Sequence, residues 1–150
     1  EVIPGISAAI SAPGLAGIPV THRGLSSAFT VLSGHAPEGF KPVLQSLDPS
    51  AMTVVVLMGV YYRKQIAKTL LGNGWSPETP CSIITAASTP KMSFWAGCLK
   101  DLAALDRTSD NCADLPGTII VGEVVRLSGV IGSGAMSTET VDAIAWQREG

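Results

Sequence analysis

The run Thr53–Met58 is the feature that most constrains how this chain can fold. Every residue from Val54 to Met58 is apolar, and the run lies between the breaking sequence Asp48-Pro49-Ser50 and Gly59. A strand with one solvated face alternates apolar and polar residues, whereas a strand covered on both faces is apolar throughout. The run therefore predicts a central strand with other elements packed against both of its faces.

Shorter apolar runs on either side of this strand alternate with segments of helical periodicity. Strands are expected over residues 26–35, 81–85, 92–98 and 118–121, and helices over residues 40–47, 61–71 and about 99–103. The strands at 81–85 and 92–98 are close in sequence and are expected to pair antiparallel. Strands that alternate with helices predict an α/β fold, here a layered α/β/α domain with a mixed, mostly parallel sheet.

Residues 1–128 are expected to form one domain, since 150 residues suffice for a single hydrophobic core. A glycine-rich sequence starts at Gly129, and residues 129–150 are therefore expected to form a flexible tail. Within this tail, Thr138–Trp146 is either a short amphipathic helix or disordered.

Composition argues against several classes of protein. A net charge of −2 gives no support for nucleic-acid binding, and the longest apolar run is far shorter than the roughly 20 residues that cross a membrane. Cys81, Cys98 and Cys112 are odd in number and lack CxxC spacing, which argues against a zinc site or a disulfide framework. No metal is expected, and reduced thiols of this kind favour a cytoplasmic protein.

The N-terminal segment combines a turn, a helix of small residues and a polar cluster. Pro4-Gly5 predicts a turn, after which Ser7 is expected to cap a helix of small residues that bends or ends at Pro13. A helix start with so few bulky side chains invites close approach by a packed neighbour or a ligand. The chain then continues through Gly17–Val20 to Thr21-His22-Arg23-Gly24.

Small residues also follow the predicted strands, at Met58-Gly59, Ala86-Ala87-Ser88 and Gly122. In open α/β sheets, ligands bind outside the carboxyl ends of the strands. Together with Ser7-Ala8, these residues are expected to outline a recess where backbone rather than side chains faces a ligand. Each small residue taken alone is more often a packing feature.

Several motifs occur in the order and spacing of a known family. They are PGIS, GIPVTHRG, FTVLSGH, VVLMG, Thr89-Pro90 and IVGEVV, and together they span about residues 1–128. On these residues the chain resembles the uroporphyrinogen-III C-methyltransferases, which are tetrapyrrole (corrin/porphyrin) methylases, and GIPVTHR is the most specific motif. The family's glycine-rich loop and GGDP-type motif are missing. The chain thus looks like the C-terminal domain alone, which is expected to fold but not to turn over by itself.

The resemblance implies that S-adenosylmethionine, or its product S-adenosylhomocysteine, lies against the C-terminal domain. The cofactor-binding residues that it implies are Ser7, Ala8, Met58, Gly59, Ala87 and Gly117. Gly117 is a mild departure, because many relatives have alanine there. His22 and Arg23 are the implied substrate-binding residues, with Arg23 gripping a carboxylate of the tetrapyrrole. Arg23 and Met58 are the implied catalytic residues, with Met58 lying between the two ligands.

The implied reaction is methyl transfer from the sulfonium to a ring carbon of uroporphyrinogen III, giving precorrin-2 for sirohaem or cobalamin synthesis. It needs no catalytic triad or carboxylate pair, and none is evident. The implied partners are the N-terminal domain of the same enzyme and a second copy in a homodimer. Two alternatives stay open: a sister precorrin methyltransferase, and a non-catalytic α/β module for dimerisation or binding.

Overall fold

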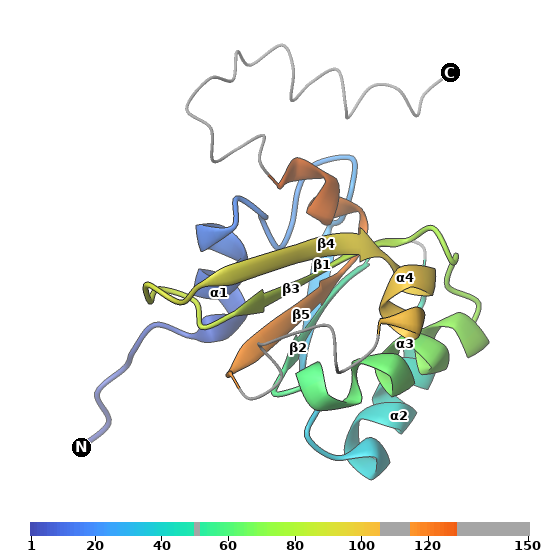
Figure 1. The fold of residues 1–150 in the computed structure, drawn as a ribbon, viewed down its shortest axis with the longest axis horizontal. Coiled ribbons are helices and arrows are strands. Elements are labelled where there is room, and N and C mark those ends of the chain that lie inside the picture. The colour runs from blue at the N-terminus through green and yellow to red at the C-terminus, as the bar shows by residue number, and fades with distance from the viewer. Residues whose placement is uncertain (50–51, 106–114, 129–150) are drawn as a thin grey trace.

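The computed structural model describes residues 1–49, 52–105 and 115–128 (Figure 1). The expected tail, residues 129–150, lies outside the described residues. A sheet of five strands has the order β1-β2-β5-β3-β4. The strands are β1 (Ala28–Ser33), β2 (Met52–Leu57), β3 (Pro80–Thr85), β4 (Ser93–Cys98) and β5 (Gly117–Val121). The helices are α1 (Ala8–Leu15), α2 (Pro37–Ser46), α3 (Arg63–Gly72) and α4 (Leu99–Ala104), with 3-10 turns η1 (Val60–Tyr62) and η3 (Glu123–Leu127).

The sheet is mixed, as expected, but the expectation that it is mostly parallel is wrong. Only β1 and β2 pair parallel in the described chain, whereas the β2–β5, β5–β3 and β3–β4 pairs are antiparallel. The reason is the position of β5, which returns between β2 and β3 and runs against both. As a result, β1, β2 and β3 still point the same way, and their carboxyl ends lie at one edge of the sheet. We call this the carboxyl edge.

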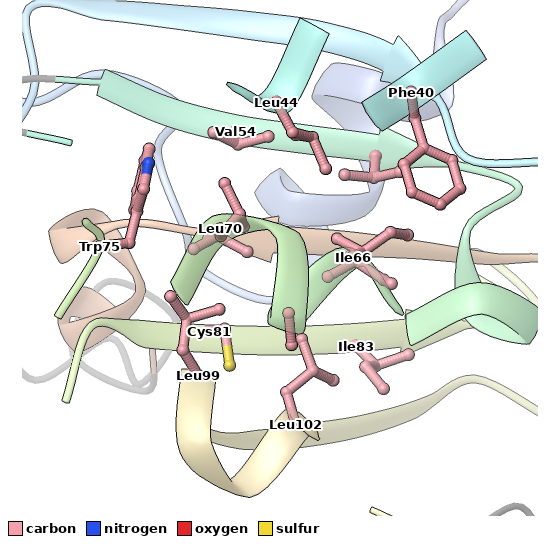
Figure 2. Packing of buried hydrophobic residues seen from close by; sticks show 14 of the residues in the cluster. Phe40, Leu44, Val54, Ile66, Leu70, Trp75, Cys81, Ile83, Leu99 and Leu102 are labelled. Carbon is pink, nitrogen blue, oxygen red and sulfur yellow. The ribbon is translucent and has the colours of Figure 1, made fainter. Parts of the chain in front are cut away.

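The central strand is apolar on both sides because both faces of the sheet are covered. Val54, Val55 and Val56 of β2 are fully buried. Helices α2, α3 and α4 pack on one face, where Phe40, Leu44, Ile66, Leu70, Leu99 and Leu102 surround the side chains of the strands (Figure 2). On the other face, Ala12 of α1 and Val124 and Val125 of η3 pack against Ile84 and Ile120. The predicted layered α/β/α arrangement is therefore present.

Helix α1 is held at both ends by local hydrogen bonds. Ser7 is the N-cap, as expected, and its Oγ accepts from the N–H of Ala9 at 3.3 Å. The helix does not end at Pro13 but continues to Leu15. It then stops in a Schellman motif, in which the Ile18 N–H donates to the Pro13 carbonyl and Gly17 has φ of 70°. Glycine at position 17 therefore ends the helix, since that conformation is costly for other residues.

The two cysteines of the described chain are free thiols in unreactive surroundings. Cys81 lies in the core beneath α4, and burial raises its pKa to about 12. Partial burial, together with the hydrogen bond that Cys98 Sγ donates to Asp101 at 2.8 Å, raises the pKa of Cys98 as well. Because the thiolate is the reactive form of cysteine, neither residue is prepared to act as a nucleophile at neutral pH.

Candidate functional site

A cavity of about 750 Å³ opens at the carboxyl edge of the sheet. It lies between the start of α1, the turns that follow β2 and β3, and the segment that leads into β5. Its lining residues are Ala8, Ala12, Leu57, Met58, Ile84, Ala86, Ala87, Thr89–Lys91 and Leu115–Thr118. The volume is within the range of about 300–1,000 Å³ that is typical of small-molecule sites.

Short side chains make this space. Ala8 and Ala12 project from one face of α1, while Ala86 and Ala87 form the turn after β3. Gly117 contributes backbone alone, and a Cβ at this position would lie 2.6 Å from Cγ2 of Val60. The walls are therefore largely apolar, with peptide groups close to the surface of the cavity. Such a surface suits a flat or compact ligand that approaches the main chain.

The turns at the cavity contain strained backbone. Met58, Ala86 and Ser88 have φ of 56°, 47° and 64°, and they are the non-glycine residues with positive φ in the described chain. A left-handed conformation costs a non-glycine residue roughly 1–2 kcal/mol. Strained residues of this kind cluster at functional sites, where the surrounding structure holds them. All three lie within three residues of the end of β2 or β3, so the backbone strain marks the carboxyl edge independently of the cavity.

Four of the residues implied by the resemblance lie together around the cavity. They are Ala8, Met58, Ala87 and Gly117. Ser7 does not line the cavity but caps α1 immediately before Ala8. Gly59 does not line it either, because its Cα packs against Gly34, where a Cβ would lie only 2.6 Å away. The expected recess therefore exists, with Ser7 and Gly59 supporting its walls.

Gly122 is not part of the recess, which corrects that expectation. It follows β5, and β5 runs against β1, β2 and β3. Its backbone lies near Met52 and Thr53, at the amino end of β2. The amino end of β5, with Gly117 and Thr118, takes the corresponding place at the cavity.

His22 and Arg23 are not brought to the cavity. They lie in a tight loop in which the His22 N–H donates to the Ser26 carbonyl at 3.0 Å, and His22 Nδ1 is 2.8 Å from the Arg23 carbonyl oxygen. Ser26 Oγ accepts from the hydroxyl of Thr53, next to the amino end of β2. The loop therefore lies toward the opposite edge of the sheet, with the length of β1 between it and the carboxyl edge.

The part of the cavity that the β3–β4 hairpin supplies was not predicted from the sequence. Thr89 and Pro90 belong to the family motifs, Lys91 follows them directly, and all three line the cavity. The short connection between two antiparallel strands was the available signal, because a hairpin from β3 must turn at the carboxyl edge. Leu115 and Pro116 were missed because their position depends on the direction of β5.

The fold and the cavity define a class, an α/β domain with a cavity of small-molecule size at the carboxyl ends of its strands. Comparison with known proteins identifies one family within this class. The profile of the Tetrapyrrole (Corrin/Porphyrin) Methylases matches residues 1–103. The chain belongs to this family.

Individual relatives agree with this assignment. The chain is 42% identical over 129 residues to the uroporphyrinogen-III C-methyltransferase of Methanocaldococcus jannaschii, covering 85% of this chain and 52% of that protein. It is 37% identical over 128 residues to a siroheme synthase of Neisseria meningitidis serogroup C, covering 85% and 26% of the two chains. Among solved structures, the uroporphyrin-III C-methyl transferase of Thermus thermophilus complexed with S-adenyl homocysteine has a TM-score of 0.66 and 34% identity, covering 85% of this chain and 54% of that one. The chain thus spans about half the length of the methyltransferases that it matches.

The described residues contain no group of three or more metal-binding side chains. Within the same residues, none of the helices has the length and apolar character needed to span a bilayer.

Proposed function

We propose that this chain is the C-terminal half of an S-adenosylmethionine-dependent uroporphyrinogen-III C-methyltransferase, which makes precorrin-2 for sirohaem or cobalamin synthesis. One observation carries the proposal. Ala8, Met58, Ala87 and Gly117, which the family resemblance implies as cofactor contacts, come from four separate segments and line a single cavity.

The residues around the cavity fit an adenosine-containing ligand. The alanines leave room for a planar base against the main chain, and the walls around it are largely apolar. S-adenosylmethionine supplies an activated methyl group, so the protein mainly has to hold the acceptor carbon in line with it. Met58 lies at the rim with an exposed, polarizable side chain that can contact both ligands.

The proposal includes the expected partners. The N-terminal domain of the same enzyme would close the cavity, which agrees with relatives about twice as long as this chain. A homodimer is favoured by Phe29 and Val31, which leave apolar surface exposed on the edge strand β1. The free thiols of Cys81 and Cys98 favour a cytoplasmic location. This chain alone is proposed not to turn over.

Replacing Ala87 by leucine tests the cavity. In the two-domain enzyme, the larger side chain is expected to weaken S-adenosylhomocysteine binding on the order of a hundredfold in calorimetry, because it occupies space that the ligand needs. Ala96→Leu is the matched control, since Ala96 is exposed on β4 outside the cavity. Unchanged binding by Ala87→Leu would contradict the assigned site. If the parent enzyme does not bind S-adenosylhomocysteine, the alternative remains that the chain is a non-catalytic α/β module for dimerisation or binding.

Arg23 is proposed to bind a carboxylate of the tetrapyrrole, with His22 beside it. Its exposed position at the other end of β1 means that it would contact the periphery of the substrate or act from a second copy of the chain. Arg23→Leu is expected to raise KM for uroporphyrinogen III about tenfold and to leave S-adenosylhomocysteine affinity unchanged. An unchanged KM would remove Arg23 from the substrate site.

A further inference from the structure

Among the described residues that line the cavity, Lys91 is the only one with a formal charge. The other lining residues are apolar or, like Thr89 and Thr118, neutral. Arg23, the cation expected to hold an acidic ligand, lies toward the other edge of the sheet. The question is therefore which negatively charged group lies close to the ammonium of Lys91.

The backbone that carries Lys91 is fixed by a network within the β3–β4 turn. Thr89 Oγ1 donates to the Ala86 carbonyl at 2.8 Å and accepts from the Lys91 N–H at 3.2 Å. The Met92 N–H donates to the Thr89 carbonyl at 3.0 Å, and the side chain of Met92 packs against the core on the α1 side of the sheet. The turn thus presents the start of the Lys91 side chain at a constant place on the rim.

The ammonium of Lys91 has no ion-pair partner within residues 1–49, 52–105 and 115–128. Two other cations of the described residues are paired: Lys100 with Glu78, and Arg126 with Glu123. Within the part of the chain that the structure describes, no carboxylate lines the cavity. The alkyl stem can lie along the apolar rim while the ammonium remains available to a ligand.

We infer that Lys91 binds a carboxylate of a ligand held in the cavity. The inference rests on the function proposed above, because both ligands of that reaction carry carboxylates. One source is the amino-acid end of the cofactor, and the other is an acidic substituent of the tetrapyrrole. The chemistry is the same in both cases, a charge-assisted hydrogen bond from the ammonium to a carboxylate oxygen.

The test compares four forms of the two-domain enzyme: the parent, Lys91→Met, Lys91→Arg and Lys68→Met. Methionine keeps the length of the side chain without its charge, and arginine keeps the charge. Lys68 is an exposed lysine of α3 outside the cavity, so Lys68→Met controls for the loss of one positive charge. Calorimetry gives Kd for S-adenosylhomocysteine and for 5′-methylthioadenosine, which has the same nucleoside but no carboxylate. Turnover gives KM and kcat for uroporphyrinogen III.

Two results support the inference and identify the source of the carboxylate. If Lys91→Met weakens S-adenosylhomocysteine about tenfold and leaves 5′-methylthioadenosine unchanged, the partner is the cofactor. If it leaves both nucleosides unchanged and raises KM for uroporphyrinogen III about tenfold at unchanged kcat, the partner is the tetrapyrrole. In either case Lys91→Arg restores most of the affinity, and added salt weakens the parent more than Lys91→Met.

Other results would overturn the inference that Lys91 binds a ligand carboxylate. Equal losses for both nucleosides would mean that Lys91 only shapes the cavity, and no change in any constant would mean that it binds neither ligand. Either result leaves the proposed function standing if the parent binds S-adenosylhomocysteine and turns over. A parent that does neither overturns the proposed function and this inference together.

Discussion

Replacing Met58 by alanine is expected to lower kcat for methyl transfer about a hundredfold in the two-domain enzyme, because small errors in the alignment of reacting groups have effects of this size. Met58 lines the cavity and is 63% exposed, so its side chain is available to ligands rather than to the core. Its φ of 56° holds it in a strained turn, which the surrounding structure must maintain. Initial rates at saturating S-adenosylmethionine and uroporphyrinogen III measure the effect.

Met58→Gly separates the thioether from the backbone strain. Glycine accepts positive φ without a steric penalty, so this variant is expected to be about 1 kcal/mol more stable than Met58→Ala while showing the same loss of turnover. Val43→Ala is the matched control, since Val43 is also an exposed apolar residue but lies on α2, away from the cavity. A Met58→Ala enzyme with the kcat of the parent would show that the side chain does not orient the ligands.

Replacing Gly34 by alanine is expected to lower the free energy of unfolding by about 3 kcal/mol, at the upper end of the usual cost of overpacking. The new Cβ would lie 2.6 Å from Cα of Gly59 and 2.6 Å from Cγ1 of Val56. The backbone cannot withdraw easily, because the Gly34 N–H donates to the Leu57 carbonyl at 2.7 Å. The steric conflict therefore falls on the turn after β2, which carries Met58.

Gly39→Ala is the control for this substitution. Gly39 lies inside α2, and a Cβ there would meet nothing within 4 Å. Alanine is expected to stabilise the helix by about 0.5–1 kcal/mol, so the two glycine-to-alanine changes should have opposite signs. Urea denaturation followed by circular dichroism measures both. If Gly34→Ala is as stable as the parent, the two turns do not pack as closely as the structure shows.

Local features of the fold were predictable because neighbours in sequence produce them. The apolar run at Thr53–Met58 predicted the buried β2, and helical spacing predicted α2 and α3. Ser7 predicted the start of α1, since an N-cap acts on the next two or three residues. Of the candidate site, Ala8, Met58 and Ala87 follow from the same local logic once the family resemblance is added, because each lies at the start of a helix or just after the end of a strand.

The order of the strands in the sheet was not predictable from such local features. The place of β5 between β2 and β3 depends on pairing between residues far apart in the chain, such as Val56 with Ile119 and Ile83 with Ile119. Neither the turns nor the periodicity of the segment encode that choice. It determines that Gly117 rather than Gly122 reaches the cavity, and it makes most strand pairs antiparallel.

The amino-acid sequence by itself determined which segments are strands and helices, where α1 begins and which family the chain resembles, because hydrophobic periodicity, caps and motifs act over a few residues. Only the tertiary structure decided the strand order, the separation of Arg23 from the cavity and the place of Lys91 on its rim. These depend on how both faces of the sheet are covered at once, and on the edge at which each strand ends.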